Sequence, residues 1–353
     1  MRALSIFLSG TLLAASGAAL CAAEPIIDMH LHALHADDQG PPPVAICAPY
    51  ANAKLGTGQP LRDAKMSGAE FADAFFHRPT CANPLWSAKD DDALREASLR
   101  ELERRNIVAV ASGPADVVSR WHAQSPSRII PALLFSPKDG PSVAELRAMI
   151  QHGDIAVIGE MTGQYDGIGP DDPANEPYFA LAEELDVPVA IHVGPGPQGA
   201  AYMDASMARY RAALTSPLAL EPVLLRHPHL RLYAMHAGWP KLDEVLAMLW
   251  AHPQLYVDVG VIDYVLPRAE FYRYLKVVVE AGFGERVLFG SDQMVWPQAI
   301  EAAIGSIEAA PFLSKKQKRD ILYNNAARFL RLDPAKSGDD SSRSRASNQT
   351  PNS

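Results

Sequence analysis

The sequence is poor in the residues on which several classes of protein depend. It has only 3 cysteines in 353 residues, too few for a disulfide-rich scaffold or a four-cysteine zinc module. Charged residues make up 21% of the chain, a mixed composition that excludes a coiled coil and a polytopic membrane protein. The net charge is -9 and no basic patch offsets it, so we expect no binding of nucleic acid.

The two ends of the chain differ from its middle. Residues 1–23 have a positive start, an uncharged apolar stretch and small residues before Glu24, which is typical of a secretory signal peptide cut after Ala23. An uncleaved membrane anchor is the alternative. Residues 333–353 are polar without apolar periodicity, and we expect a disordered tail. Export predicts a periplasmic or secreted protein that is free of the membrane after cleavage.

Two cysteines, Cys47 and Cys81, remain after the leader is removed. Both fall in one long segment, 33–89, and an oxidising compartment favours a disulfide between them. Two unpaired thiols are the alternative.

Between residues 24 and 332, short runs rich in Val and Ile alternate with helical patterns, as in parallel βα units. The expected strands are 26–32, 107–112, 129–135, 155–161, 188–193, 231–237, 255–260 and 286–291. The expected helices are 90–105, 115–124, 142–152, 175–186, 216–227, 241–251, 267–281, 298–309 and 314–331. This count predicts an α/β fold, a single-domain (β/α)8 TIM-like barrel. A doubly wound sheet is the alternative, weakened because no glycine-rich phosphate loop follows any strand.

The connection between the first strand and the first helix, 33–89, is unusually long. Loops of this length are functional or contain small elements of their own. We expect it to lie over the mouth of the barrel as a lid or a substrate wall.

The pattern Asp28-x-His30-x-His32 is the strongest local signal. Residues two apart in a strand face the same side, so His30 and His32 should point together into the barrel, with Asp28 one step deeper. Two imidazoles from one strand supply half of a divalent-metal site.

Other metal-competent side chains lie where later strands end. They are Glu160, His192, His236 and Asp292. The carboxyl ends of barrel strands form the face where barrel enzymes perform chemistry. The sequence therefore predicts His30, His32, His192 and Asp292 as metal ligands, with Glu160 and His236 as further ligands. A single histidine at a strand end is more often structural, Glu160 alone could be a buried paired carboxylate, and Asp292 alone could cap the turn after the last strand. Asp258 also ends a strand, but without an inferable partner. Seven other histidines are assigned to the surface, with His35 close enough to the site to support it.

Five segments carry a family resemblance: IIDMHLH (26–32), VIGEMTGQYDG (157–167), VPVAIHVGPG (187–196), LYAMHAGWP (232–240) and VLFGSDQM (287–294). Together they resemble the amidohydrolase superfamily, in its amidohydrolase-2 branch of metal-dependent hydrolases and decarboxylases. The resemblance implies a distorted barrel with a divalent metal, commonly zinc. Its ligand positions match His30, His32, His192 and Asp292, and its strand-6 histidine, a second-metal ligand or a substrate-polarising group, matches His236. Glu160 stands where some binuclear branches place a bridging carboxylate, so one or two ions per chain remain open.

The expected function is hydrolysis of a C–N or C–O bond in a small molecule (an amide, a lactone or another ester) through a metal-activated water. Asp292 is the expected general base, and His236 the group that polarises the carbonyl if it is not a ligand. Arg209, Tyr165 and Trp239 are expected near the substrate. Two alternatives remain, a metal-dependent non-oxidative decarboxylase of an aromatic or enoic acid and a non-catalytic ligand-binding barrel. A homo-oligomer is also left open.

Overall fold

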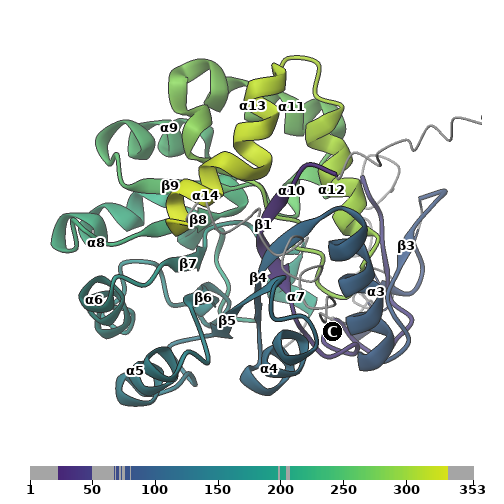
Figure 1. Cartoon of the computed structure of the whole chain (residues 1–353), viewed down its shortest axis with the longest axis horizontal. Coiled ribbons are helices and arrows are strands. Elements are labelled where there is room, and N and C mark those ends of the chain that lie inside the picture. The colour runs from purple at the N-terminus through teal and green to yellow at the C-terminus, as the bar shows by residue number, and fades with distance from the viewer. Residues whose placement is uncertain are drawn as a thin grey trace, which may run out of the picture.

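The computed structural model describes residues 23–49, 67, 69–70, 73, 76–79, 81–197, 199–203 and 207–332. Eight parallel strands in chain order form one sheet that curls into a barrel, with helices around its outside (Figure 1). The strands are β1 (Ile26–His32), β4 (Ile107–Gly113), β5 (Ile129–Phe135), β6 (Val157–Met161), β7 (Val189–His192), β8 (Leu232–Met235), β9 (Leu255–Asp258) and β10 (Val287–Leu288). All eight expected strands are present, and the predicted barrel is confirmed.

Backbone hydrogen bonds bring the first strand and the end of the last one together. Met29 N donates to Phe289 O over 2.8 Å, and Asp292 N donates to His30 O over 2.5 Å. The range predicted for the last strand was too long, because Phe289 N donates to Ile321 O of the C-terminal helical segment instead of continuing the ladder with β9. Asp292 therefore follows β10 on a loop that returns to β1.

Helices cover the barrel close to their expected positions: α3 (Asp91–Arg104), α4 (Ala115–Gln124), α5 (Val143–His152), α6 (Glu176–Leu185), α9 (Leu242–Ala251), α11 (Arg268–Val278) and α12 (Ala299–Glu308). The helix expected at 216–227 is broken into a 3-10 turn (Pro217–Leu220) and α8 (Glu221–Arg226), because Pro222 lacks the N–H that a continuous helix requires. The last expected helix is α13 (Lys315–Arg319), a π turn (Asp320–Asn324) and α14 (Asn325–Leu330). The short helices α7 (Ala200–Met203) and α10 (Ile262–Val265) lie in loops that follow strands.

The core has two parts, one between the strands and the helices and one inside the barrel. The inner part includes Ile27, Met29, Val110 and Tyr233, and α14 adds Phe329. The Phe329 ring meets that of Tyr233 edge-on, with centroids 5.5 Å apart. Helix α14 thus closes the amino end of the barrel and leaves the carboxyl ends of the strands for the site.

The long segment after β1 has structure of its own. Strands β2 (Ala45–Ile46) and β3 (Leu85–Trp86) pair antiparallel, and Trp296 Nε1 donates to Val44 O over 3.0 Å, which docks this ribbon beside the loop that follows β10. Cys47 and Cys81 form the expected disulfide. Part of the segment lies outside the described residues, so its role as a lid stays a prediction.

The predicted tail, 333–353, and all of the predicted leader except Ala23 lie outside the described residues. None of the helices in the described ranges combines the length and the apolar character that crossing a membrane requires.

Candidate metal centre

All six predicted metal ligands come together at the carboxyl end of the barrel. His30 and His32 lie on β1, Glu160 on β6 and His192 at the end of β7, while His236 immediately follows β8 and Asp292 follows β10. Each of these residues is at most 5% exposed. Two groups of three residues have ligand atoms within 4.8 Å of one another, and they consist of His30, His32 and Asp292, and of His30, Glu160 and His236.

Two β-bulges aim ligands into this centre. In β1, Asp28 pairs with Ala109 but Leu31 pairs with Ala111, so one extra residue lies between them. Met29 and His30 consequently both face inward, and Asp28 does not share the inner face as the simple alternation predicted. Its Oδ1 instead accepts hydrogen bonds from His30 N (3.0 Å) and Ser291 N (2.9 Å).

The second bulge lies at Gly159 and Glu160 of β6. Ile158 and Met161 pair with Val189 and Ile191, so three steps on β6 match two on β7. The extra residue turns Glu160 inward. Gly159 has φ +129°, and a Cβ there would lie 2.3 Å from Ala190 O, so only glycine fits this bulge without strain.

One oxygen of Glu160 faces the histidines of β1. Glu160 Oε2 lies 3.6 Å from His30 Nε2 and 3.4 Å from His32 Nε2. Asp292 Oδ1 lies 3.7 Å and 3.0 Å from the same two nitrogens. Two imidazoles and two carboxylates thus surround one point.

The other oxygen of Glu160 faces a different pair of histidines. Glu160 Oε1 lies 2.7 Å from His192 Nδ1 and 3.8 Å from His236 Nε2, and these two nitrogens are 3.0 Å apart. Glu160 therefore lies between two pairs of histidine nitrogens, all of them candidate metal ligands.

Each of the four histidines has one ring nitrogen against a fixed oxygen acceptor outside the centre. The contacts are His30 Nδ1 to Asp258 Oδ2 (3.1 Å), His32 Nδ1 to Ser112 O (3.3 Å), His236 Nδ1 to Gly260 O (3.0 Å) and His192 Nε2 to Gly194 O (3.2 Å). Each of these oxygens can accept a proton from the nitrogen that faces it, and in that tautomer the neutral ring would present the lone pair of its other nitrogen to a metal in the centre. His30 Nε2 is buried without a hydrogen-bond partner.

The charges of the centre shift the pKa values of its groups. Burial opposes protonation of His30, but the negative charges of Asp292 and Asp258 outweigh it, and the pKa of His30 lies well above its usual value. Burial alone would raise the pKa of Glu160, yet contacts with the imidazoles of His192 and His236 hold it well below its usual value. The pKa of His192 is lowered by burial and by the charge of His236. The carboxylates of Glu160, Asp258 and Asp292 thus favour positive charge at the centre.

Backbone conformation contributes to the placement of two ligands. His236 has φ +58° and Asp292 has φ +44°, a left-handed conformation that costs non-glycine residues energy and is concentrated at functional sites. Asp292 is held by its bond to His30 O and by the Tyr264 hydroxyl, which donates to Asp292 O over 2.8 Å.

Asp258 is the residue of the centre that the sequence could not assign. It is fully buried, and its carboxylate accepts from His30 Nδ1, from His236 N (3.1 Å) and from Gly260 N (2.8 Å). Its position at a strand end was the one available signal.

The three expected substrate residues differ in their placement. The Tyr165 ring borders the centre, with its centroid 4.8 Å from that of His192, and burial raises the pKa of its hydroxyl well above the usual value. Trp239 turns instead to α11, where its Nε1 donates to Glu270 Oε1 over 3.1 Å. Arg209 is exposed and packs beside Gly167.

Histidines outside the centre have separate partners. His35 pairs with Asp91 of α3 over 2.7 Å. The assignment of His227 and His252 to the surface was wrong, because both are buried. His227 lies between Glu183 Oε2 (2.9 Å) and Glu176 Oε1 (3.0 Å), contacts that the sequence separation conceals.

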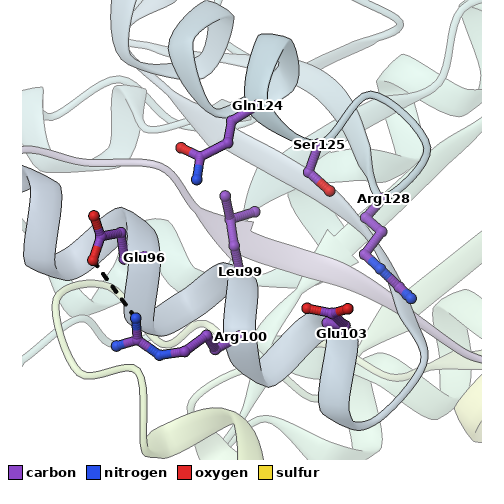
Figure 2. A pocket seen from close by; sticks show the side chains of 7 residues that line it. All are labelled: Glu96, Leu99, Arg100, Glu103, Gln124, Ser125 and Arg128. Carbon is purple, nitrogen blue, oxygen red and sulfur yellow. Dashed lines mark ion pairs between the residues drawn. The ribbon is translucent and has the colours of Figure 1, made fainter.

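The hollow shown in Figure 2 is not part of this centre. It has a volume of about 310 Å3 and is lined by residues of α3, α4 and the turn after α4. Three of the four charged side chains that line it have partners within the protein. Arg100 pairs with Glu96 over 3.6 Å, and Arg128 donates to Leu102 O and Ile107 O. This hollow therefore shares no residue with the candidate metal centre.

Comparisons with known proteins agree with this geometry. The amidohydrolase family model Amidohydro_2 matches residues 27–332. No curated protein sequence matches the chain. An uncharacterised TIM-barrel protein from Bordetella bronchiseptica is 19% identical, with a TM-score of 0.55 over 87% of this chain and 99% of that one.

Two further solved structures are similar in fold. A probable 2-pyrone-4,6-dicarboxylic acid hydrolase from Acinetobacter baumannii is 14% identical, with a TM-score of 0.53 over 88% of this chain and 100% of that one. The 5-carboxyvanillate decarboxylase from Sphingomonas paucimobilis is 16% identical, with a TM-score of 0.51 over 88% and 99%. The family match covers most of the chain and the whole barrel, and the chain belongs to the amidohydrolase-2 family.

Proposed function

We propose that this chain is an exported, metal-dependent hydrolase that cleaves a C–N or C–O bond in a small molecule, such as an amide, a lactone or another ester. The observation that carries the proposal is the position of Glu160, whose two oxygens face two different sets of histidines. A carboxylate placed in this way can bridge two divalent ions, and two-metal sites are common in hydrolytic enzymes.

The donor atoms fit such ions. His30, His32, Asp292 and Glu160 Oε2 would hold one ion. Tetrahedral zinc, with ligands at about 2.0–2.1 Å, places ligand atoms about 3.3–3.4 Å apart. The distances in this set, from 3.0 to 3.7 Å, span that value. Imidazole and carboxylate donors are those zinc accepts, and Zn2+ is the ion that we propose.

The second set supports the same conclusion. With neutral imidazoles, the lone pairs of His192 Nδ1 and His236 Nε2 converge with Glu160 Oε1 within 2.7 to 3.8 Å. Without a metal these groups can share protons, and with both imidazoles neutral they offer a cation three donor atoms. His192, His236 and Glu160 would hold the second ion.

Divalent ions bound here would supply Lewis acidity for polarising the scissile bond and would lower the pKa of water. Asp292 is the residue that we propose as the general base. Its Oδ1 lies 3.0 Å from His32 Nε2 and 3.7 Å from His30 Nε2, so the carboxylate would lie beside the ion and a water bound to it, where it can accept a proton. The same carboxyl would then return the proton to the leaving group. If only one ion is bound, His236 is free to polarise the substrate carbonyl.

The substrate is expected on the side of Tyr165. Its ring stacks on that of Tyr210 with centroids 5.8 Å apart, and Gln164, which donates to Gly194 O over 2.7 Å, keeps its buried Oε1 without a partner in the described chain. The two tyrosine rings would contact a substrate through their apolar faces, and Gln164 Oε1 would accept one hydrogen bond from it. Contacts of Arg209 and Trp239 with substrate stay predictions.

A non-oxidative decarboxylase of an aromatic or enoic acid is the second candidate. The 5-carboxyvanillate decarboxylase named above has the same fold. A single bound ion would favour this reaction, because His236 would then be available to the substrate.

We also propose that the protein works in the periplasm or outside the cell. The leader-like composition of residues 1–23 supports export, and the disulfide between Cys47 and Cys81 is typical of an oxidising compartment.

A substrate panel tests the proposal. Zinc-loaded protein is incubated with esters, lactones, amides and aromatic carboxylic acids, and both hydrolysis products and carbon dioxide are measured. We expect hydrolysis without release of carbon dioxide, and its loss in the Asp292→Asn variant. Release of carbon dioxide from an acid, with no panel member hydrolysed, would contradict the hydrolase and support the second candidate.

A further inference from the structure

Asp258 connects the two halves of the metal centre without facing either of them. Its Oδ2 contacts His30 Nδ1 over 3.1 Å, and His30 belongs to the first set of ligands. Its Oδ1 accepts from His236 N over 3.1 Å, and His236 belongs to the second set. One buried carboxylate thus binds a ligand residue from each set.

The contact with His236 is reinforced through Gly260. Asp258 Oδ1 also accepts from Gly260 N over 2.8 Å, and the carbonyl of Gly260 accepts from His236 Nδ1 over 3.0 Å. The backbone and the ring of His236 are therefore both fixed from Asp258. This is the residue that holds a left-handed φ of +58°.

The packing around His30 leaves no room for another acceptor to replace Asp258. A Cβ on Gly260 would lie 2.5 Å from His30 Nδ1, and a Cβ on Gly290 would lie 2.5 Å from His30 Cβ. Gly260 thus packs against the His30 ring and Gly290 against its Cβ, and the acceptor that contacts His30 Nδ1 is Asp258. Asp258 is fully buried, so solvent water does not compete with its carboxylate for the His30 ring.

We propose that Asp258 is a positioning residue that fixes His30 with its proton on Nδ1 and orients His236, so that both present Nε2 to the metal centre. The inference rests on the proposed metal-binding function. Carboxylates that hold the far nitrogen of a metal-binding histidine raise affinity about 10–100-fold.

The tautomer makes a prediction that a purely structural role does not. In Asp258→Asn, the amide oxygen can satisfy the N–H groups of His236 and Gly260, but the amide NH2 then faces His30 Nδ1. His30 must move its proton to Nε2, the nitrogen that should bind metal. Asp258→Ala removes the acceptor but leaves the ring free to choose its tautomer. We therefore expect Asn to weaken metal binding at least as much as Ala, although Asn is the better match in shape.

The test measures the affinity for Co2+ and Zn2+ by competition with a chelator, together with the visible spectrum of the cobalt-loaded protein. Asp258→Asn should bind both ions about 10–100-fold more weakly than the unsubstituted chain. Asp263→Asn is the matched control, because Asp263 is also fully buried but neither of its carboxylate oxygens has a hydrogen-bond partner in the described chain. It should bind metal as the unsubstituted chain does.

Three results would overturn the inference or its basis. If the unsubstituted chain binds no divalent metal, the proposed function itself fails. If it binds metal and folded Asp258→Asn binds equally well, or clearly better than Asp258→Ala, only the positioning role fails. A zinc-bound crystal structure of the unsubstituted chain requires no variant to fold. It should show the metal about 2.0–2.1 Å from His30 Nε2 with Nδ1 still on Asp258, and metal bound by Nδ1 or by Asp258 would refute the inference.

Discussion

The six side chains of the metal centre can be found in the sequence because each lies where an apolar run ends. The pair His30 and His32 is visible from spacing alone. Asp258 could not be assigned in the same way, because its partners His30 and His236 are 228 and 22 residues away. The acceptor that bonds to a given histidine ring is determined by tertiary packing. The residues next to that histidine in the sequence do not reveal it.

The general base gives the first prediction. Asp292→Asn keeps the shape of the side chain but removes the proton acceptor. We expect the turnover of a hydrolysed substrate to fall by about 10²–10⁴-fold, measured with metal-loaded protein at saturating substrate. Full turnover in this variant would rule out Asp292 as the base.

Asp263 gives a prediction about stability and pH. Burial, together with the charge of Asp28, raises the pKa of its carboxyl well above 3.8. The folded protein then binds this proton more tightly than the unfolded chain does, so stability falls as the pH rises from the unfolded value through the folded one. Asparagine does not ionise. The gain in melting temperature of Asp263→Asn over the unsubstituted chain should therefore be larger at pH 8 than at pH 4.

Asp320 supplies a control of opposite sign. Burial would raise its pKa, but Asn324 and Lys316 lower it, so this carboxylate stabilises the fold above the unfolded pKa and loses that effect as the pH falls. Asp320→Asn should lose more stability at pH 8 than at pH 4. An Asp263→Asn variant whose effect is the same at both pH values would contradict the account.

Among the elements, all eight predicted strands are present. Seven of them begin and end within two residues of the predicted bounds and the last is shorter than predicted, whereas the bulges in β1 and β6 were not predicted. A prediction from alternation assumes that the pairing register of a strand does not shift. It therefore put Asp28 on the same inner face as His30, which the bulge in β1 contradicts. A bulge becomes visible only when the register of two paired strands is compared.

The bulge at Gly159 predicts a large effect of a small change. In Gly159→Ala, the new Cβ would lie 2.3 Å from Ala190 O at φ +129°. Gly153→Ala is the control, because Gly153 also has a positive φ, +82°, but no atom within 4 Å of the added Cβ. The control should lose about 1–2 kcal/mol in denaturant unfolding. Gly159→Ala should lose more stability and bind less metal, since Glu160 is displaced. Equal losses in the two variants would mean that the bulge is not tightly constrained.

At the scale of the whole molecule, the alternation of strands and helices predicted the barrel, and the positions of strand ends predicted the side on which the candidate metal ligands gather. The structure adds that α14 closes the opposite end and that the ribbon β2–β3 docks beside the loop after β10. Neither follows from periodicity, because both depend on contacts between distant segments.

The disulfide between Cys47 and Cys81 is expected to stabilise the fold. Cys47 and Cys81 are separated by 34 positions, and closing a loop of that length stabilises a fold by about 3–4 kcal/mol in the chain-entropy model. Replacing both cysteines with serine should lower the melting temperature and make the melting of the protein insensitive to reductant. An unchanged melting temperature would show that the disulfide does not constrain the fold.

The number of divalent metal ions per chain tests the central claim most directly. It is measured by elemental analysis of protein purified without chelator, beside a Glu160→Gln variant. If Glu160 bridges two ions, the unsubstituted chain holds about two and the variant about one, because the glutamine amide offers a single oxygen. About one ion in both proteins would contradict the bridge and leave His236 free to act on substrate, and no bound metal in the unsubstituted chain would contradict the metal centre itself.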